Sequence, residues 1–120
     1  MNTYLTVNVN ASSAKTIRCA YNTLLSFETV YDSYLKENIH TAYAAIAYNL
    51  NYRGKPLFKR KMDLACIIII STAAEHSCTM QLTVNTAGIA GVGVDSAGKT
   101  HEFAAEFLKR FSETLEETNA

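Results

Sequence analysis

The chain has 120 residues, of which 48% are apolar and 18% are charged. A chain of this length buries roughly two-thirds of its unfolded surface, which excludes disorder and any need for disulfide or metal stabilisation. Eleven basic and eleven acidic residues cancel, so no net charge attracts the protein to nucleic acid or to an anionic membrane.

The cysteines and the N-terminal sequence predict a cytoplasmic protein. Three cysteines, Cys19, Cys66 and Cys78, cannot all pair within one chain, which is typical of a reducing compartment. The first ten residues have neither the basic nor the apolar region of a signal peptide. The longest apolar run, residues 64–70, is too short to cross a membrane. We therefore expect no membrane association.

The first part of the chain predicts a strand and then a long helix. Over residues 3–9 apolar and polar side chains alternate, which is typical of a half-buried strand. The segment 10–13 offers side-chain oxygens that cap a helix start. Apolar residues then recur at steps of three and four, which predicts a helix to about Glu37: Ile17, Ala20, Leu24, Phe27, Tyr31 and Leu35.

The middle of the chain, residues 39–72, is ambiguous. The alanines of 39–50 and their apolar spacing favour a second helix, although a hairpin entry before Gly54 and Pro56 is the alternative. Four consecutive isoleucines favour a buried strand over about 64–72, although a helical stripe also fits that segment. We expect a helix for 39–50 and a strand for 64–72.

The last third predicts a hairpin and a helix. Alternation over 79–85, a turn at Gly88 and a second apolar alternation over 89–94 indicate two antiparallel strands. After Gly98, a helix over about 100–117 places an apolar stripe inward: Phe103, Phe107, Leu108, Phe111 and Leu115. The whole chain, 1–120, is thus predicted to be one α+β domain. Its small, mainly antiparallel sheet (strands near 3–9, 64–72, 79–85 and 89–94) packs against a long N-terminal helix and a C-terminal helix.

The segment 93–100 matches the pattern G-x-x-x-x-G-K-[ST] and over these eight residues resembles the Walker A loop of the P-loop NTPases. The resemblance implies phosphate binding by the backbone between Gly93 and Gly98 and by Lys99, with Thr100 on Mg²⁺. Two observations oppose it: the preceding strand is predicted to be antiparallel, and no apolar strand ending in Asp supplies the metal site. We favour a surface turn followed by a helix that Thr100 caps.

Charge is divided between the two halves of the chain. Residues 1–62 contain eight basic and three acidic residues, whereas residues 63–120 contain three basic and eight acidic ones. Five basic residues fall within nine positions, beside Tyr52 and Phe58: Arg53, Lys55, Lys59, Arg60 and Lys61. Such a segment contacts phosphates and bases in some nucleic-acid binders, and in other proteins it is a solvated loop. Divided charge favours self-association or an acidic protein partner.

One face of the predicted sheet is polar but uncharged. It carries Thr6, Asn8, Thr79, Gln81, Thr83, Asn85, Gly91 and Gly93. Such a face is either simply hydrated or a partner interface. Five tyrosines within 22 residues, a residue type enriched at interfaces, add to the second interpretation, although packing of the second helix also explains them: Tyr31, Tyr34, Tyr43, Tyr48 and Tyr52.

No catalytic or metal-binding constellation is visible in the sequence. His76 and Cys78 lie two positions apart, but a structural zinc requires four ligands, and no cofactor motif accompanies them. We expect a small cytoplasmic protein-interaction module, a homo-oligomer without a catalytic site of its own. Its predicted partner-binding residues are Tyr52, Arg53, Lys59, Arg60, Lys61, Thr79, Gln81 and Thr83. The alternatives are nucleotide binding through 93–100 and nucleic-acid binding through 53–61.

Overall fold

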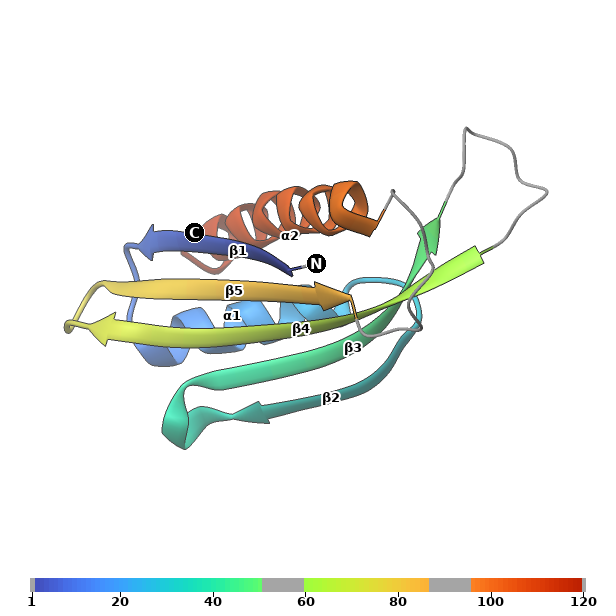
Figure 1. The fold of residues 1–120 in the computed structure, drawn as a ribbon. Helices are drawn as coiled ribbons and strands as arrows, with labels where there is room; N and C mark the ends of the chain where they lie inside the picture. Colours follow the sequence, from blue (N-terminus) through green and yellow to red (C-terminus); the bar gives the residue numbers. More distant parts are fainter. Residues whose placement is uncertain (1, 51–59, 87–95, 120) are drawn as a thin grey trace.

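A computed structural model describes residues 2–50, 60–86 and 96–119 (Figure 1). Their order is β1 (Asn2–Val9), α1 (Ser13–Leu25), β2 (Val30–Lys36), the short 3₁₀ helix η1 (Glu37–Ile39), β3 (Thr41–Leu50), β4 (Arg60–Ala73), β5 (Cys78–Thr86) and α2 (Ser96–Asn119). The strands form one sheet in the order β1-β5-β4-β3-β2, and every neighbouring pair is antiparallel. The predicted α+β class, with an N-terminal and a C-terminal helix, is confirmed.

The predicted strand over 3–9 and the start of the first helix are confirmed. Ser12 caps α1, and its hydroxyl accepts a hydrogen bond from the backbone N–H of Lys15 at 3.3 Å. The helix ends at Leu25, however, so the prediction that it continues to Glu37 is wrong. Thr29 adopts a left-handed conformation (φ 56°) where the chain turns, and β2 follows. Phe27, Tyr31 and Leu35 were assigned to the helix because they are four residues apart. A spacing of four fits the two-residue period of a strand as well as the period of a helix.

The predicted helix over 39–50 is also wrong, because this segment forms β3. Ala42 and Ala44 lie on the inner face of the sheet with no exposed surface, and α1 packs over this strand. Alanine has the highest helix propensity of any residue, but helix propensity contributes little free energy. Burial of these side chains against α1 outweighs it. Tyr43 and Ile46, which share a face in the predicted helix, point to opposite sides of the sheet.

The two central strands agree with the predictions. The predicted strand over 64–72 lies within β4, which begins earlier, at Arg60, and the strand over 79–85 is β5. In the described residues β5 pairs with β1 on one side and with β4 on the other. The predicted strand over 89–94 and the turn before it lie outside the described residues.

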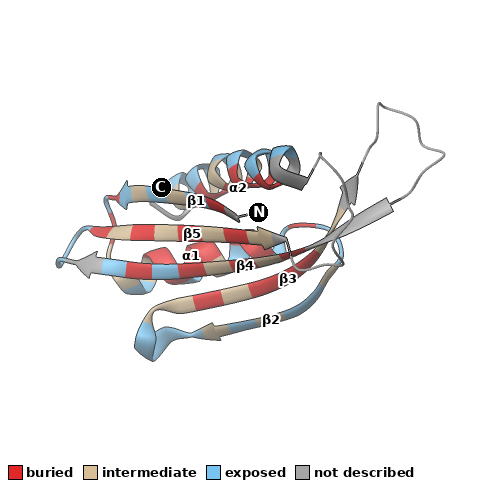
Figure 2. Cartoon of the chain, viewed as in Figure 1, coloured by how far each residue is buried: buried red, intermediate tan, exposed pale blue. Residues whose placement is uncertain are grey.

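Both helices pack on the same face of the sheet, so the chain forms two layers (Figures 1 and 2). The predicted C-terminal helix is confirmed as α2, and its inward stripe is anchored by Phe103, Phe107 and Phe111, each at most 2% exposed. α1 lies over β3 and β4, whereas α2 lies over β1 and β5. In the part of the chain that the structure describes, neither helix is long and apolar enough to span a membrane.

Enlarging an inner alanine should destabilise the fold, whereas enlarging an outer one should not. Ala44→Leu places three extra carbon atoms beneath α1, and we expect it to lower the free energy of unfolding by about 1–3 kcal/mol. Ala65→Leu on the outer face of β4 is the matched control, with an expected change of at most about 0.5 kcal/mol. Urea denaturation followed by circular dichroism measures both, and equal losses would contradict the two-layer packing.

Candidate functional site

The outer face of the sheet, opposite the helices, unites three of the predicted partner-binding residues. Thr79, Gln81 and Thr83 lie along β5 on this face, half-buried between β1 and β4. Thr79 is held by its neighbour, because its hydroxyl donates to Oδ1 of Asn8 on β1 at 3.2 Å. The described side chains that β1, β3, β4 and β5 place on this face are all uncharged.

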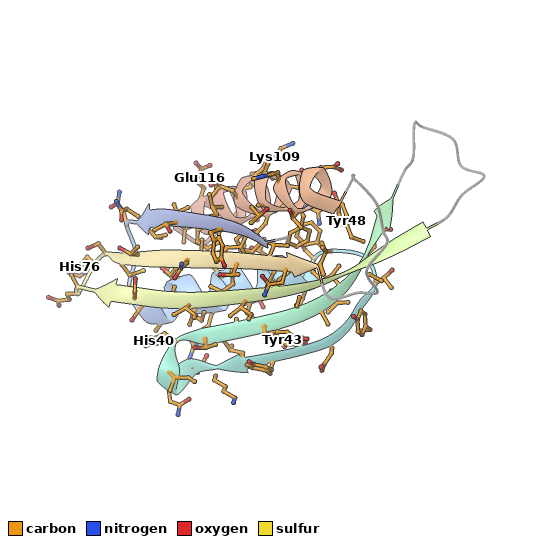
Figure 3. All side chains as sticks on the ribbon, in the orientation of Figure 1. His40, Tyr43, Tyr48, His76, Lys109 and Glu116 are labelled. Carbon is orange, nitrogen blue, oxygen red and sulfur yellow. The ribbon has the colours of Figure 1, made fainter. Side chains whose placement is uncertain are left out.

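The polar face that the sequence predicts also carries apolar side chains in the structure. Tyr4 on β1 is 61% exposed, Ile69 on β4 is 43% exposed and Tyr34 on β2 is 41% exposed. The ring of Tyr34 stacks on that of Tyr43 with 5.1 Å between centroids, and Figure 3 shows Tyr43 on the adjacent strand. Tyr34 and Tyr43 were not predicted to lie on the sheet, because residues 26–50 were assigned to helices, which hides the alternation of β2 and β3.

The basic segment is only partly placed by the structure. Tyr52, Arg53 and Lys59 lie outside the described residues. Arg60 and Lys61 begin β4, where they pair in register with Leu50 and Asn49 of β3. These two positions continue the sheet at the end where β3 stops and β4 starts.

The Walker A-like residues fall at the start of α2. Gly93 lies outside the described residues, whereas Gly98, Lys99 and Thr100 belong to the helix. The side chain of Thr100 is 1% exposed, and its hydroxyl accepts a hydrogen bond from that of Thr3 at 2.6 Å. A Cβ added at Gly98 would meet no atom within 4 Å, so no close approach requires glycine there. This hydroxyl thus joins α2 to β1 inside the protein, which favours the interpretation as a structural helix start.

A second cluster, which the sequence did not reveal, lies where β3 and the end of α1 meet α2. We call it the α2 seam; it consists of Phe27, Tyr48, Glu102, Phe103, Glu106 and Arg110. The phenol of Tyr48 donates to Oε1 of Glu102 at 2.9 Å, and its ring meets Phe103 edge to face at 5.6 Å. Figure 3 shows Tyr48 beside the first turns of α2.

Arg110 lies at the other end of the α2 seam. Its guanidinium lies 4.1 Å from the ring centre of Phe27, and its Nε donates to Glu106 at 3.0 Å. Its Nη1 also donates to the carbonyl of Ser26 at 3.2 Å, just beyond α1. Such a cation over an aromatic ring adds roughly 0.5–2 kcal/mol of attraction. The seam therefore ties the end of α1 to the middle of α2.

The surroundings of Tyr48 in the α2 seam raise the pKa of its phenol. This pKa is raised to about 12, first by burial and then by the hydrogen bond to Glu102 and the charges of Glu102 and Glu106, while Arg110 opposes the rise. The phenol therefore stays protonated at neutral pH and acts as a hydrogen-bond donor.

The cysteines are buried thiols. Burial raises the pKa of Cys66 to about 12 and also raises that of Cys19. Cys78 is buried as well, and its thiol donates to the hydroxyl of Thr16 at 3.2 Å. Such thiols are poor nucleophiles and poor metal ligands, because both roles need the thiolate. Within residues 2–50, 60–86 and 96–119, no three His, Cys, Asp or Glu side chains group as a metal site.

Large apolar side chains between the sheet and the helices are fully buried: Ile17, Leu24, Ile46, Leu64, Ile68, Met80, Leu82, Val84, Phe103 and Phe107. Other apolar side chains on the inner side of the sheet are only half-buried: Leu5, Val7, Leu35 and Tyr48. The inner layer is therefore closely packed at the first set of residues.

Several solved structures have a fold similar to that of this chain. No family model and no curated protein matches the chain. Among solved structures, it is similar to Ara h 8.0201, with a TM-score of 0.59, 9% identity and 98% of each chain covered. It is also similar to a START superfamily protein from Mycobacterium smegmatis, with a TM-score of 0.52, 11% identity and 99% of each chain covered. The Zhui aromatase/cyclase from Streptomyces sp. R1128 matches with a TM-score of 0.52 at 9% identity, over 99% of this chain and 93% of that one. At such identities the likeness shows a shared fold.

The raised pKa of Tyr48 predicts a loss of stability at high pH. A folded-state pKa of about 12, above the ordinary value of 10.0, means that this site stabilises the fold fully below about pH 10. The contribution is lost as the pH rises towards 12. The difference in ultraviolet absorbance titration between the unmodified protein and Tyr48→Phe measures this pKa. Glu102→Gln should lower it without restoring 10, since burial, the largest cause, remains; no change would contradict the assigned hydrogen bond.

Proposed function

We propose that the chain is a protein-interaction module that binds a protein partner through the outer face of its sheet. The supporting observation is the combination of exposed apolar groups, Tyr4, Tyr34 and Ile69, with the uncharged Thr79, Gln81 and Thr83. These apolar groups are spread across the sheet, from β1 at one border to β2 at the other, with the polar side chains of β5 between them. Exposed apolar groups among polar ones occur at interaction sites, and tyrosine supplies large contact area at low entropic cost.

The close packing at the centre of the inner layer adds to this proposal. Leu82, Ile68 and Phe107 are fully buried, so a ligand placed at these residues would have to displace packed side chains. The buried thiols, with the pKa of Cys66 and Cys19 raised, offer no activated nucleophile. The outer face needs no rearrangement to meet a partner.

We place this module in the cytoplasm. The support is that Cys19, Cys66 and Cys78 are free thiols, each at most 5% exposed. A chain that keeps three thiols unpaired suits a reducing compartment.

Charge on the outer face should abolish partner binding. The double variant Ile69→Lys/Gln81→Lys adds two ammonium groups to the centre of the face, where desolvating them opposes association. We expect at least a roughly tenfold loss of a stoichiometric partner captured from nuclease-treated source cells, measured by quantitative mass spectrometry.

The matched control is Ser112→Lys, which adds the same group on the exposed side of α2. It should retain the partner. Capture that is equal for the double variant and the control would disprove binding through this face, as would the absence of any stoichiometric partner of the unmodified protein.

A second candidate function is the binding of a small aromatic molecule at the α2 seam. Its support is the half-buried Tyr48, whose phenol and neighbouring rings form a polar and aromatic edge, together with the fold shared with an aromatase/cyclase. Native mass spectrometry of protein purified from source cells should then show a stoichiometric adduct, and Tyr48→Phe should lower its occupancy. Protein without an adduct would exclude a tightly bound ligand.

A further inference from the structure

The edge strand β2 has one side that no other strand covers in the described part of the chain. It pairs with β3 along one side only, and it forms the outer border of the sheet in Figure 1. Such an edge presents backbone N–H and C=O groups that can pair with another strand. Natural proteins usually block such pairing, so the side chains of β2 decide whether this edge is blocked or used.

Five residues of β2 are complementary to a second copy of themselves. Asp32, Tyr34 and Lys36 alternate with Ser33 and Leu35 and lie on the outer face, with opposite charges at the two ends and the tyrosine between them. The two charged side chains are exposed. In an antiparallel pair, residues directly opposite each other interact, and opposite charges there are stabilising.

We propose that two copies of the chain associate edge to edge through β2, antiparallel and centred on Tyr34. Asp32 then faces Lys36 of the partner subunit, and Lys36 faces Asp32 of the partner subunit. The two five-stranded sheets become one continuous sheet of ten strands. This inference rests on the edge of the sheet and does not require the function proposed for the outer face, although Tyr34 belongs to both surfaces.

The charges select this register over its neighbours. Shifting one copy by two residues in either direction places a charged side chain opposite Tyr34 and breaks both ion pairs, while a shift of one residue reverses the faces of the sheet. In the proposed register Ser33 faces Leu35 of the partner subunit on the inner side. The bulge between Val30 and Asp32 lies outside the paired segment.

The side chains next to this segment extend the contact. Tyr34 is stacked on Tyr43, and the ammonium of Lys36 lies 5.0 Å from the centre of the Tyr34 ring, so its ring is already held in place. Pairing at Tyr34 continues this stack into the partner subunit. Tyr31 and Ile39, which are 57% and 56% exposed, add apolar surface near the two ends of the segment.

The opposite edge of the sheet lacks this complementarity. The border strand β1 has no charged residue along its length, so nothing in it selects one register of self-pairing. The net charge of zero leaves no overall repulsion between two copies at neutral pH. At the β2 edge, both the uncovered backbone and the complementary charges of Asp32 and Lys36 favour a second copy of the chain as the partner.

Charge reversal tests the proposed register. In Asp32→Lys the new lysine faces Lys36 of the partner subunit at two symmetric positions, and in Lys36→Asp two carboxylates meet in the same way. Sedimentation equilibrium should show a dimer for the unmodified protein and a dissociation constant raised roughly tenfold or more in each single variant. The double variant Asp32→Lys/Lys36→Asp restores opposite charges and should dimerise again.

The double variant also guards against a folding defect, since it has the same composition as the unmodified protein. Ile69→Lys/Gln81→Lys should leave the dimer intact, which separates this interface from the outer face. A monomer at every concentration would overturn the proposal, and so would a dimer that both single reversals leave unchanged.

A cysteine placed on the two-fold axis gives an independent test. Residues opposite each other in an antiparallel pair have Cα atoms about 4.5–5.5 Å apart, within reach of a disulfide. Under mild oxidation Tyr34→Cys should form a covalent dimer, visible on a non-reducing gel. The native cysteines are buried, and Tyr4→Cys, at a more exposed position on the opposite border strand, is the control. Equal cross-linking of both variants would contradict the β2 interface.

Discussion

The packing of α1 against the sheet depends on small side chains at the centre of the inner face. Ala42 and Ala44 on β3 and Cys66 on β4 have no exposed surface, and none of them is long enough to hold a helix at a distance. Because α1 lies close, Ile17 and Leu24 fill the remaining volume, and the phenylalanines of α2 complete the layer. Both helices lie on this face, and among the described residues no helix covers the other face of the sheet.

The fold of this chain does not by itself determine its function. The chain shares its arrangement of strands and helices with proteins as different as Ara h 8.0201 and an aromatase/cyclase. A fold carries many functions, which are determined by the side chains of a site. Here the inner side chains pack on one another, whereas Tyr4, Ile69 and Tyr34 remain exposed on the outside. The functions proposed for this chain therefore belong to its surfaces.

Sequence reasoning succeeded where one periodicity dominated. β1, β5 and α2 were predicted because alternation or a helical stripe runs through each without a competing pattern. It failed over residues 26–50, where alanine content and spacings of four fit both a helix and a strand. The α2 seam was invisible for a related reason: Tyr48 and Glu102 are 54 residues apart, and only the pairing of β3 brings them together. Thr79, Gln81 and Thr83 were placed on one face correctly because alternation alone determines it.

The pairing of β1 with β5, which is far along the chain, has a consequence for synthesis on the ribosome. β1 has β5 as its sheet neighbour, and Thr3 reaches Thr100 across 97 positions of sequence. The N-terminal strand therefore emerges long before either of its partners exists. Contacts between such distant residues slow folding, because a large loop must close before they form. The nascent chain thus carries an unpaired, alternating strand until β5 and α2 have been synthesised, and β1 finds its partners only when both have left the ribosome.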